Sequence, residues 1–265
     1  MAFQLKNLKF DFSKIFNFDK LFTTKIRKSD IKKNVLKDFA LLLRHFVIEH
    51  KNAVIVALGI FLIILIAIPL YLNSYEKKVN EANKYFEAGL GAYRKAILEK
   101  ELSNEERISL MQQSINTFQY VIDQYKNTPP AADALFYQAN IYYDLNDFNN
   151  ALKKYQEYFE KYKRSYFADY ALLNIGKCYE QLNNFQGAIN AYTELLKKYK
   201  KRNNVPAAMF NLAKIYELSN NFNEAFKYYN QLISQYPYSS WAYESKLRVL
   251  FIQSLSQSQS RLQKK

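Results

Sequence analysis

The feature that most constrains this chain is a repeat with a period of 37 residues. The motif LNDFNNA at 145–151 returns as LNNFQGA at 182–188 and as LSNNFNEA at 218–225. Self-similarity at this length is typical of stacked helical units, each of which buries its apolar face only against its neighbours. The sequence therefore predicts an all-α helical solenoid. Three tyrosine series keep the same period: Tyr142, Tyr179 and Tyr216; Tyr155, Tyr192 and Tyr229; and Tyr125, Tyr162, Tyr199 and Tyr236.

Each unit reads as helix A, a tight turn and helix B. Asn146, Asn183 and Asn220 fall where helix A ends, and asparagine tolerates the left-handed conformation that a helix C-terminus often needs. The residue after each asparagine is Asp or Asn, which can cap the start of helix B. The expected helix pairs are 132–145 with 148–162, 166–182 with 185–200, and 205–219 with 222–236. Small residues allow the paired helices to approach closely, at Ala139, Gly176, Ala213, Ala151, Ala188 and Ala225.

A second feature is the charge-free stretch AVIVALGIFLIILIAIPLYL at 53–72. It is long enough to cross a bilayer and has no polar face, which a core helix of a soluble protein would keep. About fifty residues precede it and no A-x-A pattern follows, so an uncleaved signal anchor is favoured over a cleavable signal peptide. The sequence predicts a single-pass transmembrane helix.

Charges beside this stretch predict its orientation. Within twenty residues on each side, five basic residues precede it and three follow. The positive-inside rule then puts the N-terminus in the cytoplasm and the repeats outside it. The reverse topology, which would make the chain a cytosol-facing receptor, remains the alternative.

These features divide the chain into segments. The expected order is a basic cytoplasmic segment at 1–51, a transmembrane helix at 52–75 and a solenoid at 76–253. Within the solenoid we expect a degenerate unit at 77–127 with helices at 77–98 and 106–125, clear units at 128–164, 165–201 and 202–238, and a capping helix at 239–253. A disordered tail is expected at 254–265. An amphipathic helix is predicted from Ser29, after a Phe- and Lys-rich stretch suited either to an anionic membrane surface or to a loose tail.

The repeat residues also carry a family resemblance. The pattern at Leu172, Gly176, Tyr179, Ala188 and Tyr192 resembles the tetratricopeptide repeat, with a period of 37 in place of 34. The Tyr-rich units are similar to those of the outer-membrane assembly lipoprotein and the Tol-Pal-associated periplasmic coordinator. The whole layout of basic segment, span and repeats is similar to the ancillary subunit of the bacterial Sec translocon. This resemblance implies an anchor in the bacterial inner membrane, with the repeats in the periplasm.

This resemblance implies a right-handed superhelix in which helix A residues line a concave, protein-binding groove. Asn140 and Asn174 match two asparagines of a known carboxylate clamp, but Phe136 and Ala207 occupy its lysine positions, so binding of acidic tails is not predicted. We expect the asparagine amides to be available to an extended client, although each residue fits an ordinary solvated helix face equally well. The expected groove residues are Tyr137, Asn140, Tyr143, Asp144, Asn174, Lys177, Glu180, Asn211, Lys214 and Glu217.

Other chemistry finds little support. Both histidines, His45 and His50, precede the apolar stretch, and no Gly-rich phosphate loop is present, so neither an enzyme nor a cofactor or metal site is predicted. Cys178 is the single cysteine and is expected to be a small buried residue. The net charge is +14, and basic residues cluster at 197–202. Nucleic acid is still disfavoured as a partner, because the helix dipole favours cations at a helix C-terminus and nearby acids offset most other basic residues. The expected function is a membrane-anchored scaffold for exported proteins, with an envelope-assembly or cell-wall adaptor as the alternative.

Overall fold

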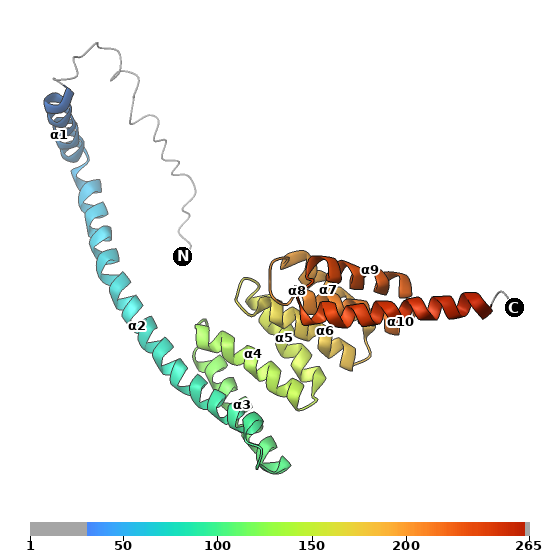
Figure 1. The fold of residues 1–265 in the computed structure, drawn as a ribbon. Coiled ribbons are helices and arrows are strands. Elements are labelled where there is room, and N and C mark those ends of the chain that lie inside the picture. The colour runs from blue at the N-terminus through green and yellow to red at the C-terminus, as the bar shows by residue number, and fades with distance from the viewer. Residues whose placement is uncertain (1–30, 263–265) are drawn as a thin grey trace, which may run out of the picture. The chain divides into compact units, whose positions relative to one another are not determined.

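The computed structural model describes residues 31–262, and all the regular secondary structure in this range is helical (Figure 1). The chain divides into two compact units, 1–71 and 72–265, which are considered one at a time. The helices are α1 (Ile31–Glu49), α2 (Lys51–Leu98), α3 (Asn104–Gln124), α4 (Pro129–Asp144), α5 (Phe148–Lys161), α6 (Ala168–Gln181), α7 (Phe185–Lys198), α8 (Val205–Leu218), α9 (Phe222–Gln235) and α10 (Ser240–Leu262).

The first unit contains α1 and the apolar part of α2. By length and composition α2 can cross a membrane, and none of its most apolar window is buried by other parts of the protein. Ile63, for example, keeps 66% of its surface exposed. This exposure separates α2 from the buried core helix of a soluble fold. The helix predicted from Ser29 corresponds to α1, but Ser29 itself and the Phe- and Lys-rich stretch before it lie outside the described residues.

The second unit begins with the remainder of α2. Its C-terminal half packs on α3 through Phe86 and Phe118, whose ring centroids are 5.5 Å apart, and Ser114 Oγ donates a hydrogen bond of 2.9 Å to the carbonyl of Gly89. The predicted separation into one helix at 52–75 and another at 77–98 is wrong, because α2 is continuous through both. The connecting residues 73–78 contain neither Gly nor Pro, so nothing in them breaks a helix.

The three clear units form the hairpins α4–α5, α6–α7 and α8–α9, as predicted. Asn146, Asn183 and Asn220 adopt φ values of 60°, 57° and 58°, which confirms the left-handed residue at each turn. Asp147, Asn184 and Asn221 then accept a hydrogen bond from the backbone N–H three residues later, which confirms the predicted caps. Two adjacent residues thus end one helix and start the next.

Two other helix ends differ from the prediction by three residues or more. α4 begins at Pro129 rather than at 132, because Thr128 caps the helix and prolines fit its first turn. α10 continues to Leu262, so the expected helix end at 253 and the disordered tail from 254 are wrong as far as Leu262. Residues 254–262 contain no Gly or Pro, and polar composition alone does not end a helix.

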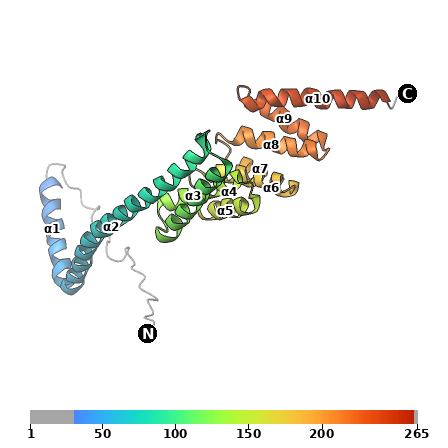
Figure 2. The same ribbon diagram turned by 90° about the horizontal axis from the view of Figure 1, so that it is seen from below.

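The core of the stack is built from helix B tyrosines and helix A small residues. Tyr155, Tyr192 and Tyr229 are almost fully buried, and a methyl group added at Gly176 would collide with the ring of Tyr192. Cys178 is buried as expected, and burial raises the pKa of its thiol to about 12. The hairpins succeed one another along the stack, with α10 closing it against α9 and α8 (Figure 2).

Candidate functional site: the helix A face

The predicted groove residues lie on α4, α6 and α8, the A helices of the three clear units. Successive A helices pack side by side through the helix B between them, so residues 37 apart recur along one face of the stack. The structure therefore brings the predicted residues onto a common surface, and their individual contacts decide how much of each is available to a partner.

The buried tyrosines of helix B reach this surface with their hydroxyl groups. Tyr155 Oη donates a hydrogen bond of 2.5 Å to Asn140 Oδ1 on α4 and accepts one of 3.1 Å from Asn174 Nδ2 on α6. A buried phenol needs a partner for its hydroxyl, and here it finds one on each of two successive A helices. The hydrogen bonds thereby join neighbouring units.

The same arrangement recurs one unit later. Tyr192 Oη donates to Glu180 on α6, and Asn211 Nδ2 on α8 donates to Tyr192 Oη at 3.4 Å. Burial, followed by the charge of Glu180, raises the pKa of the Tyr192 phenol far above its usual range. Lys214 Nζ of α8 forms a second link to Glu180, at 2.8 Å from Oε2.

A third copy of the arrangement lies at the end of the stack. Tyr229 Oη donates to Glu217 Oε2 at 2.9 Å, and Arg248 Nε of α10 donates to the same oxygen at 3.0 Å. Arg248 stands 37 residues after Asn211, so it takes the asparagine's place in the repeat. The sequence analysis missed Arg248, although the period itself pointed to it. We call these three tyrosines and their partners the polar ladder: Tyr155, Asn140, Asn174, Tyr192, Glu180, Asn211, Tyr229, Glu217 and Arg248.

The polar ladder bears on one expectation about the groove. The amides of Asn174 and Asn211, which were expected to be available to a client backbone, each donate a hydrogen bond to a tyrosine hydroxyl. Asn211 and Glu217 keep only 8% and 7% of their surface exposed. Their recurrence at the unit period is therefore explained by packing, because each unit must satisfy the same buried phenol.

At the first junction the ladder is replaced by aromatic contacts. Phe118 stands one period before Tyr155 and has no hydroxyl, and Tyr137 occupies the place of the asparagine. Their ring centroids lie 6.2 Å apart, and Tyr137 also meets Phe86 at 5.7 Å. Tyr137, which was expected in the groove, is thus half-buried, and its ring packs against core phenylalanines. Asp144 accepts a hydrogen bond of 2.5 Å from Tyr93 of α2.

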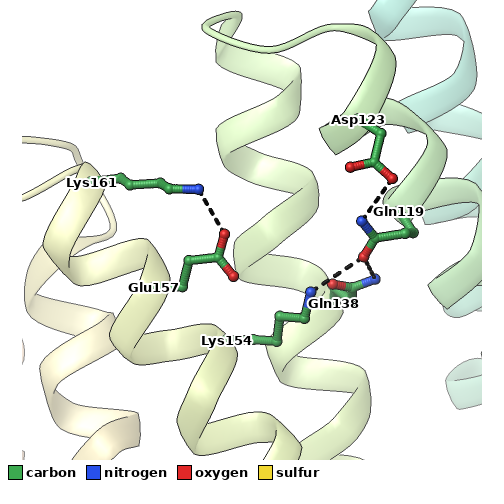
Figure 3. Close-up of polar contacts among 6 residues, drawn as sticks. All are labelled: Gln119, Asp123, Gln138, Lys154, Glu157 and Lys161. Atoms are coloured by element: carbon green, nitrogen blue, oxygen red, sulfur yellow. Dashed lines mark hydrogen bonds and ion pairs between the residues drawn. The ribbon is translucent and has the colours of Figure 1, made fainter.

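Beside this junction lies a buried amide, Gln138, which the sequence analysis did not single out. It bonds to Gln119, whose side chain joins three helices (Figure 3). Gln138 Nε2 of α4 donates to the carbonyl of Ile115 at 3.1 Å and to Gln119 Oε1 of α3 at 3.2 Å. Lys154 Nζ of α5 also donates to Gln119 Oε1, at 3.2 Å. No periodic signal marks Gln138, because the residues one and two periods later are Ile175 and Leu212.

The side chains that remain available on the helix A face are fewer than predicted. Tyr143, Lys177 and Lys214 are each half-buried. Burial lowers the pKa of the Lys177 ammonium, and the nearby charge of Glu180 opposes that shift. A half-desolvated ammonium attracts carboxylate or carbonyl oxygens. Within residues 31–262, no group of three or more His, Cys, Asp and Glu side chains is placed to hold a metal ion.

Comparisons with known proteins agree with the repeat architecture. The chain is similar in structure to MamA, with 18% identity, a TM-score of 0.44, and coverage of 58% of this chain and 85% of MamA. It is also similar to a tetratricopeptide repeat protein from Parabacteroides merdae, with 21% identity, a TM-score of 0.45, and coverage of 69% and 74%. It is also similar to the apo form of RapI, with 16% identity and a TM-score of 0.49. This match covers 64% of this chain and 47% of RapI, about half of that protein. At such TM-scores these likenesses carry no information about function.

The sequence comparisons are more specific about the repeats. No curated protein sequence matches the chain significantly. A family model of the tetratricopeptide repeat matches three overlapping segments, 111–166, 138–202 and 173–240. These segments contain α4 to α9 and every tyrosine of the polar ladder. Residues 111–240 of this chain are therefore built from tetratricopeptide repeats, the architecture of protein–protein interaction scaffolds.

Proposed function

We propose that this chain is a scaffold of the bacterial cell envelope, anchored in the inner membrane by α2, whose repeats bind exported proteins during translocation or folding. The observation that carries the proposal is the continuity of α2. A single helix contains both an exposed apolar stretch of membrane-crossing length and the first helix of the repeat stack. A membrane anchor and an interaction domain are thus joined without a flexible linker sequence.

The charge distribution supports an extracytoplasmic position for the repeats. Lys32, Lys33, Lys37, Arg44 and Lys51 precede the apolar stretch within twenty residues, against three lysines after it. Basic residues close to a span are retained on the cytoplasmic side. The proposed topology therefore has the N-terminus in the cytoplasm and the solenoid outside it.

The client-binding surface is proposed to be the helix A face, reduced to the side chains that the polar ladder leaves available. Tyr143 offers a ring for apolar side chains, and Lys177 offers an ammonium group to carbonyl and carboxylate oxygens. Lys214 is already paired with Glu180. An extended polypeptide presents both kinds of group along its length.

The topology is tested by reporter fusions. Alkaline phosphatase, which is active only outside the cytoplasm, should be active when fused after Lys265 and inactive when fused after Lys51. Green fluorescent protein does not fluoresce after export through the Sec pathway. It should therefore fluoresce when fused after Lys51 and not when fused after Lys265. Fluorescence after Lys265 together with inactive phosphatase there would overturn the topology and favour a cytosol-facing receptor.

The role is tested by purification from gently solubilised membranes with mass spectrometry. Translocon subunits and exported precursors should be enriched with the native chain. The variant Lys177→Gln should reduce crosslinking of precursors by about tenfold, equivalent to 1.4 kcal/mol. Lys153→Gln, at an exposed position of α5, is the matched control and should leave it unchanged. Enrichment of wall-synthesis or outer-membrane assembly proteins in place of precursors would favour an envelope-assembly adaptor.

A further inference from the structure

A cavity of about 580 Å³ opens at the junction between the α4–α5 hairpin and the start of α6. Five of its eleven lining residues are aromatic, and four of these come from the end of α5 and the loop that follows it. The other lining residues are Tyr75 of α2 and residues of the same loop, of the turn before α4 and of the first turns of α4. Ring pairs are close together, with centroids 5.2 Å apart for Tyr158 and Tyr162 and 5.1 Å apart for Tyr166 and Phe167. Tyr158 Oη is engaged by Ser165 Oγ at 2.8 Å, so this hydroxyl already has a partner.

One carboxylate, that of Asp133 on α4, lines this aromatic cavity. Asp133 is half-buried, and burial raises the pKa of its carboxyl group. Among the ion pairs of the described residues, none includes Asp133. The charge is thus held in a partly desolvated place with no cation to offset the cost.

The repeat does not require this carboxylate. One and two periods after Asp133 the chain has Tyr170 and Ala207, and the same helical position packs without a charge in both. Two basic groups on segments that line the cavity are engaged elsewhere. Lys78 Nζ donates to the carbonyl of Lys126 at 3.4 Å, and Lys163 pairs with Glu160 at 2.8 Å. An uncompensated carboxylate that packing does not need points to a ligand that brings a positive charge.

The chemistry of the walls selects among cations. Aromatic faces and a carboxylate together attract an ammonium or guanidinium group, and the rings also accommodate an aliphatic stem. Arg202 of this chain already lies over the outer ring, Tyr166, at 5.9 Å. A lipid headgroup would bring a phosphate with its amine, but no lysine or arginine is among the described residues that line the cavity. A basic side chain of a protein fits this lining better than a lipid does.

We propose that this cavity, here called the Asp133 pocket, binds a lysine or arginine side chain presented by a protein partner. The inference rests on the proposed function only in taking the partner to be a protein. Asp133 supplies the charge, and Tyr158, Tyr162 and Tyr166 supply the ring surfaces around the stem. The Asp133 pocket lies at the ends of the helices, so it would add a specific contact to the less selective helix A face.

The test uses the full-length chain in phosphatidylglycerol nanodiscs and two fluorescein-labelled peptides. The first is Gly-Ser-Lys-Ser-Gly, and the second has norleucine in place of lysine, which keeps the stem and removes the charge. In fluorescence anisotropy titrations the lysine peptide should bind about tenfold more tightly, a difference of 1.4 kcal/mol. Asp133→Asn should abolish this difference, whereas the control Glu160→Gln, at an exposed carboxylate, should preserve it.

Three outcomes would overturn the proposal: equal affinity for both peptides, no binding of either, or a lysine preference that survives Asp133→Asn. Repeating the titration in phosphatidylethanolamine nanodiscs tests whether the pocket binds a lipid amine, because the amine of this lipid would then compete with the lysine peptide. If that lipid suppresses lysine-peptide binding about tenfold, the occupant is a lipid amine and not a protein side chain. Asp133→Asn should melt at least as high as the native chain, because a neutral amide costs less to bury. If the Asp133 pocket is contradicted by these titrations but precursors still copurify with Asp133→Asn, the proposed scaffold function is not affected.

Discussion

At the scale of single residues, the stack depends on how closely helix A and helix B approach. In α6, Gly176 faces the ring of Tyr192, and this ring cannot move aside because its hydroxyl is bonded to both Glu180 and Asn211. Gly91 in α2 has nothing within 4 Å of the place where a Cβ would be. The two glycines therefore give a matched pair of positions at which to test this contact.

We predict that Gly176→Ala lowers the free energy of unfolding by about 1–3 kcal/mol through overpacking. Gly91→Ala, by contrast, should raise it by up to about 1 kcal/mol, because alanine favours a helix. Urea denaturation followed by circular dichroism measures both changes. Equal effects of the two substitutions would contradict the close contact between Gly176 and Tyr192.

The polar ladder makes a second prediction at this scale. Replacing Asn174 and Asn211 together by Ala should lower the free energy of unfolding by about 0.5–1.5 kcal/mol per site, because each tyrosine hydroxyl loses a donor. The matched control replaces Asn149 and Asn223, two exposed asparagines on helix B that are two periods apart. In thermal melts the Asn174 and Asn211 double variant should unfold at a lower temperature than the control. Equal melting temperatures would contradict a structural role for these amides and favour a role in client binding.

At the scale of elements, α10 acts as the A helix of a further unit. Arg248 takes the ladder position and links α10 to Glu217 of α8, so it compensates a carboxylate that is 7% exposed. Leu250, however, stands one period after Ala213, where the other units have a small residue. Its side chain is 62% exposed, and no helix B packs on it within residues 31–262.

Removal of this link has a defined cost. Breaking a fully buried ion pair costs about 3–5 kcal/mol, and Arg248→Ala should cost less, about 2 kcal/mol, because the arginine side chain is 38% exposed. Adding Glu217→Gln should recover part of the loss by removing the uncompensated charge. Lys227→Ala, which breaks an exposed pair with Glu224, should change stability by less than about 1 kcal/mol. Urea titrations compare the variants, and equal losses for Arg248→Ala and Lys227→Ala would contradict the assignment.

At the scale of the whole molecule, stability comes from stacking of neighbours and not from a single central core. A chain that ends after Lys200 lacks α8, α9 and α10, and so loses the cover over α7. We predict that it unfolds at a lower temperature and less cooperatively than the full chain. Both are compared in the same detergent, so the apolar part of α2 contributes equally.

Cys178 provides an internal probe of the same truncation. Its thiol is buried and has a pKa of about 12, so it stays protonated and unreactive at neutral pH while the stack is closed. Alkylation by iodoacetamide should be slow in the full chain and faster in the truncated one. Equal alkylation rates and equal melting temperatures would contradict the nearest-neighbour stacking.

Much of this fold is determined by the sequence alone, because the signals are local. A left-handed Asn146 followed by a capping Asp147 ends one helix and begins the next whatever surrounds them. The period of 37 and the charge-free length of 53–72 are likewise properties of the chain itself. The repeat architecture and the candidate membrane helix were therefore predictable.

Only the tertiary structure decided which polar side chains are internal. Asn174 and Lys177 look equally suited to a solvated face. Both are half-buried in the structure, and stacking brings the Tyr155 hydroxyl within hydrogen-bonding distance of the asparagine. Arg248 and Asp133 acquire their surroundings from helices far away in the sequence. Whether a polar group contacts water, a neighbouring hydroxyl or an aromatic ring depends on how successive units stack. The period of the sequence shows that a residue recurs, but it does not show what that residue contacts.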